Sequence, residues 1–166
     1  MWTHSKYGYD ALGNRLRITL VRTAYYPDAD SDSGTHHIRY ALVPHPGSWQ
    51  DADIPRRGLE FNQPLVVGSS SDGAVGSHTP VRPLRSGLAT VILAGKKRAC
   101  DTNGVVVRLY ESGGRAGNVR LSGVPAGWSA REVSIVEDPV GPLLVEHGEV
   151  ELAFSACQVR SVLLES

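Results

Sequence analysis

The sequence predicts an all-β fold, an antiparallel β-sandwich of about nine to ten short strands, in two lobes with very little helix. Three observations predict it. Apolar and polar residues alternate in most apolar runs, which is the period of a half-buried strand. The 166 residues include 18 Gly and 10 Pro, scattered between those runs as turn residues are. No amphipathic stripe with helical period is longer than two turns.

The first part of the chain contains two strong strand patterns, at residues 15–21 and 37–43. Each places three apolar side chains on one face and polar side chains on the other. The side chains expected to face inward are Leu16, Ile18 and Leu20 in the first strand, and Ile38, Tyr40 and Leu42 in the second. Two strands are too few to close a sandwich, so we expect this part to be incomplete by itself.

Residues 48–55 are the best helix candidate. Ser48 is a suitable N-cap, and Pro55 is expected to stop or kink the helix. The expected helix is therefore only one or two turns long.

A regular strand rhythm begins after residues 68–87, which are rich in Gly, Pro and Ser and are expected to form a linker. Apolar runs then recur about every 8–12 residues, which is typical of a sandwich or barrel. The expected strands are 88–94, 104–110, 118–122, 130–136, 142–146, 149–154 and 158–164, with a tight hairpin at His147-Gly148. We therefore expect three parts: 1–67, the terminal strands of a larger and here incomplete β-sandwich; 68–87, a linker; and 88–166, a small C-terminal β-sandwich.

Charge and composition exclude several classes of protein. Seventeen basic residues balance seventeen acidic ones, so no basic field suggests a nucleic-acid partner. No run of 18 apolar residues exists, so no membrane span is expected. Cys100 and Cys157 are isolated in the sequence, so we expect two buried free thiols, although a single long-range disulfide stays open.

Two clusters have the residue types of metal ligands but not the spacing. Asp28, Asp30 and Asp32 resemble the start of a calcium loop, but Ser33 and Arg39 occupy the positions where Gly and Glu are required. We therefore expect a solvated loop.

The histidines are similarly unpromising. Adjacent His36 and His37 point to opposite faces of a strand, and they and His45 are interpreted as separate surface or structural residues. No metal site is expected in this chain.

Catalytic motifs are missing as well. No nucleophile elbow is present, and the glycine-rich run Gly113–Gly117 does not open a helix, so it is not expected to bind phosphate. Glu111, Glu137 and Glu165 lie at strand ends, and we interpret them as rim positions or ion pairs. No pair of carboxylates suggests glycoside chemistry, so no catalytic residue is assigned.

Aromatic side chains are frequent near the N-terminus, and two interpretations of them stay open. A platform for stacking on sugar rings is one. Burial between the lobes is the other, and it is the more ordinary outcome for large aromatic rings. The residues concerned are Trp2, Tyr7, Tyr9, Tyr25, Tyr26 and Trp49.

An ordered series of motifs runs along nearly the whole chain. It begins with Lys6-Tyr7-Gly8-Tyr9-Asp10 and Asn14–Arg22. It continues through Tyr26-Pro27-Asp28, Tyr40-Ala41-Leu42, Leu59–Leu65, Leu93–Lys97, Val106–Glu111 and Val159–Leu164. This series resembles the C-terminal β-sandwich region of glycoside hydrolase family 38 α-mannosidases, in their bacterial, vacuolar and cytosolic branch. The chain departs from the family pattern at Thr3-His4-Ser5 and at Phe154–Gln158.

The resemblance implies a division of labour. Such enzymes are retaining, zinc-dependent mannosidases whose catalytic barrel and zinc ligands lie N-terminal to the matched region. The chain is then expected to be a non-catalytic tail, inactive alone, without a cofactor of its own. Its expected partner is the catalytic region, and through it mannosides. Tyr7 and Arg22 are the candidates, by motif position, for residues near the sugar site of the full-length enzyme.

The resemblance to this branch also suggests a bacterial cytoplasmic location. Two other functions stay open: a stand-alone carbohydrate-binding β-sandwich module, and an interaction module without a ligand. Homo-oligomerisation through exposed strand edges stays open too. Linkage specificity does not follow from the sequence.

Overall fold

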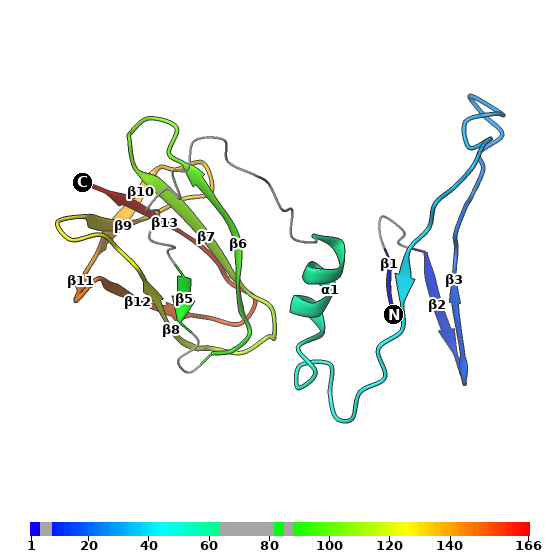
Figure 1. Cartoon of the computed structure of the whole chain (residues 1–166), viewed down its shortest axis with the longest axis horizontal. Helices are drawn as coiled ribbons and strands as arrows, with labels where there is room; N and C mark the ends of the chain where they lie inside the picture. Colours follow the sequence, from blue (N-terminus) through cyan, green and yellow to red (C-terminus); the bar gives the residue numbers. More distant parts are fainter. Residues whose placement is uncertain (4–7, 64–81, 85–87) are drawn as a thin grey trace, which may run out of the picture. The chain divides into compact units, whose positions relative to one another are not determined.

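The computed structural model describes residues 1–3, 8–63, 82–84 and 88–166. The chain divides into two compact units, residues 1–67 and residues 68–166. Each unit is described by itself (Figure 1). The expected linker, residues 68–87, lies almost entirely outside the described residues, so its nature stays a prediction.

The first unit is built from small pieces of regular structure. Two antiparallel pairs of strands and one helix are present among its described residues. β2 and β3 form a hairpin, and β1 pairs with β4. The bounds are β1 Trp2–Thr3, β2 Tyr9–Leu12, β3 Arg15–Ile18, β4 Tyr40–Ala41 and α1 Ile54–Asn62.

The expectation of inward-facing side chains in this unit is wrong for the described residues. Leu16 is 52% exposed and Leu42 is 63% exposed. Within residues 8–63 every side chain is at least partly exposed. The alternation is present, but among residues 8–63 no second layer buries either face of the β2–β3 hairpin.

The helix begins next to Pro55, the residue that was expected to end it. Residues 48–53 form hydrogen-bonded turns, and α1 starts at Ile54 with Pro55 in its first turn. A proline there loses no helical hydrogen bond, because the first N–H groups have no partner in any helix. Asp53 caps the helix in a left-handed conformation, with φ 50°, and Arg39 stacks over the ring of Phe61 at 5.2 Å from its centroid.

The second unit is an antiparallel sandwich of two sheets, which face each other in Figure 1. The five-stranded sheet has the order β10-β9-β13-β7-β6, and the four-stranded sheet has the order β11-β12-β8-β5. The bounds are β5 Arg82–Leu84, β6 Val91–Arg98, β7 Val105–Glu111, β8 Gly117–Ser122, β9 Ser129–Val133, β10 Pro139–Leu143, β11 Val145–Glu146, β12 Glu149–Phe154 and β13 Val159–Glu165. The all-β fold class is confirmed.

The core lies between the two sheets. Alternate side chains of β12, namely Val150, Leu152 and Phe154, point inward, as the sequence pattern predicts. They meet apolar side chains from β6, β7, β8, β9 and β13, including Val107, Leu109, Val119, Leu121, Val162 and Leu164. Full burial of a Leu or Val contributes roughly 1.5–3 kcal/mol, so this unit has its own source of stability.

Some strands in the structure differ in length from the strands predicted from the sequence patterns. The pattern at 130–136 ends early because Ser134 Oγ accepts hydrogen bonds from the N–H groups of Val136 and Asp138, which turns the chain. The pattern at 142–146 divides between β10 and β11, which lie in different sheets. The predicted His147-Gly148 hairpin is confirmed, with φ of 52° and 76° at the two turn residues.

All four outer strands of the sandwich carry features that hinder further strand pairing. β6 exposes Lys96, Lys97 and Arg98, and β10 contains Pro139 and Pro142. Both strands also have a register shift where they pair with their neighbours. In the other sheet, the outer strand β5 contains Pro83, and the outer strand β11 is only two residues long. Such features are typical of protected sheet edges.

Membrane-spanning helices are not found in the described part of the chain. The single helix there, α1, is too short and too polar to cross a bilayer.

Candidate functional site

The two site residues suggested by the sequence are not brought together by described structure. Tyr7 lies outside the described residues. Arg22 is exposed and lies in an irregular segment. The strand expected to end near Arg22 stops at Ile18, so Arg22 is not at a strand end. The assignment of both residues to a sugar site stays a prediction.

The aspartate and histidine clusters lie in exposed irregular chain. Asp28 Oδ1 accepts a hydrogen bond from the N–H of Asp30 at 3.0 Å, a local turn that uses one carboxylate. His36 Nε2 lies 2.9 Å from the carbonyl oxygen of Asp32. Among the described residues no three His, Cys, Asp or Glu side chains are placed to hold a metal ion.

Three of the N-terminal aromatic side chains, those of Tyr25, Tyr26 and Trp49, are exposed within the first unit. Tyr25 is 89% exposed, Tyr26 is 86% exposed and Trp49 is 46% exposed. Burial of these rings between the two units stays a prediction, because each unit is described by itself.

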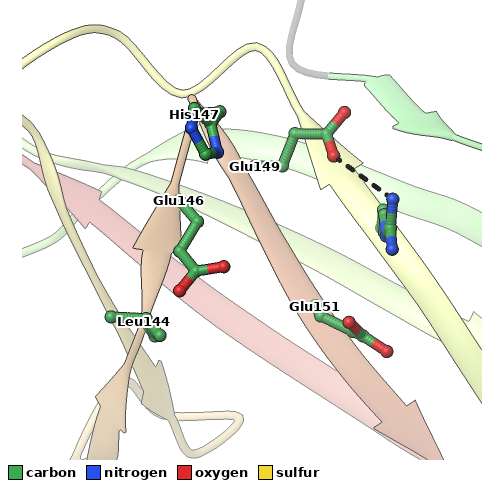
Figure 2. Close-up of a pocket in the computed structure, with 6 residues that line it drawn as sticks. Leu144, Glu146, His147, Glu149 and Glu151 are labelled. Carbon is green, nitrogen blue, oxygen red and sulfur yellow. Dashed lines mark ion pairs between the residues drawn. The ribbon is translucent and has the colours of Figure 1, made fainter.

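A shallow hollow with a polar lining lies on the outer face of the four-stranded sheet (Figure 2). Its volume is about 390 Å³. Three carboxylates, from Glu146, Glu149 and Glu151, line it beside His147. The hairpin formed by β11 and β12 explains why these carboxylates lie close together. Glu146 lies opposite Glu149 in the register of the two strands, and alternation along β12 places Glu149 and Glu151 on the outer face. Arg120 and Leu144 complete the lining.

Two of the three carboxylates have partners across the strand pair. Asn118 Nδ2 donates to Glu151 Oε1 at 2.8 Å. Arg120 lies 4.0 Å from Glu149, the ion pair marked in Figure 2. Glu146 and His147 are exposed. Such a surface can accept hydrogen bonds from hydroxyl groups, but glycoside cleavage requires two carboxyl groups facing one bond in a cleft. The hollow is open, so it does not support a catalytic assignment.

A second carboxylate, Glu111, is buried to 2% exposure at the end of β7. Its two oxygens accept five hydrogen bonds, all between 2.6 and 3.1 Å. The donors are Thr90 Oγ1 and the backbone N–H groups of Gly113, Gly114, Arg115 and Cys157. The glycine-rich run therefore does surround an anion, but the anion is a carboxylate of the same chain.

These hydrogen bonds set the protonation state of Glu111. Burial alone would raise the pKa of this carboxyl group. The bonds from Thr90, Cys157, Gly113 and Arg115 outweigh that effect and lower the pKa from 4.5 to about 2. A charged acceptor binds N–H donors more strongly than a neutral one. Glu111 thus fixes the loop after β7 to the turn between β12 and β13. The earlier interpretation as a rim position or ion pair is wrong.

The loop around Glu111 has no room for a side chain at Gly113. A Cβ atom there would lie 2.5 Å from Thr90 Cγ2 and 3.1 Å from Glu111 Oε1. Thr90 itself accepts from the N–H of Ser112 through its carbonyl oxygen at 3.0 Å. The glycine is thus required by close packing around the carboxylate.

Both cysteines are free thiols, and both are exposed. The expectation of free thiols is confirmed, but the expectation that they are buried is wrong. Each lies in a loop between strands, Cys100 between β6 and β7 and Cys157 between β12 and β13, rather than on an inward face.

Comparison with known proteins identifies related sequences. Residues 90–162 match the family model described as "Glycosyl hydrolases family 38 C-terminal beta sandwich domain". Alpha-mannosidase 2C1 of Mus musculus is 33% identical over 168 residues, covering 96% of this chain and 16% of that protein. Alpha-mannosidase 2C1 of Homo sapiens is 32% identical over 164 residues, with the same coverages. The alpha-mannosidase of Saccharomyces cerevisiae is 34% identical over 127 residues, covering 64% of this chain and 11% of that protein.

Proposed function

Because this chain belongs to glycoside hydrolase family 38 through the C-terminal β-sandwich domain at residues 90–162, we propose that it is a non-catalytic C-terminal region of an α-mannosidase. The chain spans only 16% of the length of the mouse and human relatives. In this proposal it supports a catalytic region that it does not itself contain. The retaining mechanism and the zinc ion belong to that region.

The single observation that carries the proposal is the contrast between the two units. Every buried apolar side chain of the described residues belongs to the second unit, between Leu88 and Leu164. The first unit exposes large apolar side chains instead, among them Leu12 at 71% and Leu42 at 63%. Soluble domains bury such side chains against a second layer. A larger neighbouring region would supply that layer.

A non-catalytic role agrees with the chemistry of the described residues. Glu111, the buried carboxylate at the end of β7, is saturated with hydrogen bonds from its own chain. The carboxylates of the outer hollow are exposed or paired. Neither arrangement presents a general acid and a nucleophile to one substrate bond.

Tyr7 and Arg22 are proposed to approach the sugar site only in the complete enzyme. Arg22 is exposed in this chain, so its guanidinium group is accessible to hydroxyl groups, which its fixed fork of donors can recognise. In a complete enzyme, Arg22→Lys should raise the KM for an aryl α-mannoside more than it lowers kcat. Arg15→Lys, an exposed arginine on β3, is the matched control and should change neither.

A chimeric enzyme tests the main proposal. The segment of the human alpha-mannosidase that matches this chain is deleted, and in a second protein it is replaced by this chain. The deletion should abolish hydrolysis of an aryl α-mannoside, and the replacement should restore a measurable part of it. A third protein carrying only residues 88–166 should restore less, because it lacks the first unit. Equal activity of the deletion and the replacement would contradict the proposal.

A second function, binding of carbohydrate by the chain alone, is favoured by the exposure of Tyr25 and Tyr26. Flat exposed rings can stack on sugar faces, as the sequence suggested. Titration calorimetry with mannose oligosaccharides would measure such binding. Affinity that is lost in the Tyr25→Ala, Tyr26→Ala double variant supports this function, and undetectable binding rejects it.

A further inference from the structure

The loop between β6 and β7 brings a thiol, an ammonium group and a carboxylate together. Lys97 Nζ donates a hydrogen bond to Cys100 Sγ at 3.2 Å. Cys100 Sγ in turn donates to Glu137 Oε1 at 3.4 Å. Lys97 and Glu137 also form an ion pair. The three side chains therefore form one connected cluster, from two hairpins that are far apart in the sequence.

The cluster is held in place by its surroundings. Glu137 has a left-handed backbone conformation, with φ 75°, and its side chain is only 10% exposed. Its Oε2 accepts the backbone N–H of Cys100 at 2.8 Å. The loop closes with a hydrogen bond from the N–H of Ala99 to the carbonyl oxygen of Gly104 at 2.9 Å. The Lys97 and Cys100 side chains thus meet in a defined geometry.

The thiol is open to small reagents. Cys100 is exposed, and it lines a surface hollow of about 430 Å³ formed by residues 98–103. Lys97 is 48% exposed. A molecule as small as hydrogen peroxide can therefore reach the sulfur from this side. Cys157 is exposed as well, and it provides an internal comparison.

From this geometry we propose that Cys100 and Lys97 form a peroxide-sensitive pair, in which oxidation joins Cys100 Sγ covalently to Lys97 Nζ. The chemistry takes two steps. Peroxide first oxidises the thiol to a sulfenic acid, Cys–SH + H₂O₂ → Cys–SOH + H₂O, a reaction typical of accessible cysteines. The lysine nitrogen then displaces the hydroxyl group, Cys–SOH + Lys–NH₃⁺ → Cys–S–NH–Lys + H₂O + H⁺.

Each residue of the cluster has a part in the second step. Condensation of a sulfenic acid with a nitrogen is known where a backbone nitrogen is close to the sulfur. Here the lysine nitrogen occupies that position. The ammonium group gives up two protons: one leaves with the hydroxyl group as water, and the other passes to solvent or to the Glu137 carboxylate. The N–S bond is favoured because Lys97 Nζ already lies 3.2 Å from Cys100 Sγ.

The linkage would also change the contact between the two hairpins. A sulfenamide nitrogen carries no positive charge, so the ion pair between Lys97 and Glu137 would be lost. The turn at residues 134–138, which includes Glu137, would then be held to β6 by fewer interactions. Oxidation of one thiol would thereby loosen a neighbouring loop, and a thiol reductant would restore it.

Mass spectrometry tests the proposal on the full chain carrying Cys157→Ser, which removes disulfide formation between the two cysteines. After treatment with hydrogen peroxide, a peptide containing both Lys97 and Cys100 should lose about 2 Da, as a sulfenamide requires. Dithiothreitol should reverse the loss. Lys97→Arg keeps the positive charge but supplies a much weaker nucleophile, and it should reduce the linked product more than tenfold.

A second measurement separates the linkage from general oxidation. Hydrogen exchange of residues 134–138 should increase on oxidation of the Cys157→Ser protein and should not change in the Cys100→Ser, Cys157→Ser protein. The proposal is overturned if Cys100 only gains oxygen atoms, to the same extent with Lys97 or Arg at position 97. It is equally overturned if the peptide is unchanged while Cys157 in the wild-type chain is oxidised.

Discussion

Replacement of Glu111 by Gln should destabilise the second unit strongly. The substitution keeps the size of the side chain but removes its charge. One of its two oxygens becomes an NH₂ group that faces N–H donors. Oε1 accepts from two donors, Thr90 and Gly113, and Oε2 accepts from three, Gly114, Arg115 and Cys157. At least two donors would therefore lose their acceptor in a site that is 2% exposed. A buried polar group without a partner costs about 1–3 kcal/mol.

The pKa of Glu111 expresses the effect of the same hydrogen bonds as a free energy. Lowering the pKa of Glu111 from 4.5 to about 2 corresponds to roughly 3 kcal/mol of preference for the charged form. Solvent screening near the protein surface reduces this figure, so we expect a loss of about 2–3 kcal/mol at pH 7. For a unit of about 100 residues that loss lowers Tm by roughly 10–20 °C.

The dependence on pH has a defined sign. The pKa of Glu111 is lower in the folded state, so its contribution is fully present above about pH 4.5. It is lost as the pH falls toward about 2. Glu137, whose pKa the hydrogen bond from Lys97 lowers to about 2, contributes in the same window. The difference between wild type and Glu111→Gln therefore isolates Glu111: it should be largest at pH 7 and shrink between pH 4.5 and pH 2.

The assay is urea unfolding followed by the fluorescence of Trp128, which packs against the core of the second unit. Trp2 and Trp49 are changed to Phe in every protein so that only Trp128 reports. Asp101→Asn, in the exposed loop between β6 and β7, is the matched control for loss of one charge and should change stability by less than about 0.5 kcal/mol. If Glu111→Gln unfolds like this control at both pH values, the argument for the buried carboxylate is refuted.

Four further predictions concern the whole chain. Purified chain should not hydrolyse an aryl α-mannoside, with or without zinc; activity that disappears on mutation of one of its residues would contradict this. Metal analysis after dialysis should find well below one zinc per chain, and a stoichiometric zinc lost in His36→Ala or His45→Ala would overturn it. Limited proteolysis should cut first within residues 68–87 and leave 88–166 intact; survival of 1–67 alone would show that the division is wrong. Leu121→Ala, at 0% exposure in the core, should cost about 2–5 kcal/mol, whereas Leu144→Ala, at 72% exposure, should cost less than about 0.5 kcal/mol.

The sequence predicted the second unit well because its strands satisfy local rules. β12 alternates strictly between inward Val150, Leu152 and Phe154 and outward Glu149 and Glu151. The turn before it needs two residues with positive φ, and His147-Gly148 is suited to it. The same rule failed in the first unit. Alternation shows which face of a strand is apolar, but it cannot show whether the chain itself supplies the covering layer.

Two other features escaped prediction for different physical reasons. Pro55 lies in the first turn of α1. A proline is common both in the first turn of a helix and just after its end, so residues 48–55 alone could not show which end of the helix Pro55 marks. The site around Glu111 depends on Cys157, 46 positions away in the sequence. Only the turn between β12 and β13 brings that N–H group to the carboxylate. The glycines at 113 and 114 indicated that backbone N–H groups could surround an anion. The sequence could not show whether that anion is a bound ligand or, as in the structure, the Glu111 carboxylate.

The protected edges of the sandwich determine how this domain can be attached to anything larger. Growth of either sheet by addition of a strand is hindered on all four outer strands. The features are Lys96 and Lys97 on β6, Pro139 and Pro142 on β10, Pro83 on β5 and the shortness of β11. A neighbouring region must therefore contact the domain through loops and sheet faces, where side chains rather than backbone groups decide the fit. Such contacts can diverge in sequence between relatives while the sandwich stays the same. The same edges should keep the domain from forming fibrils when it is produced without its neighbour.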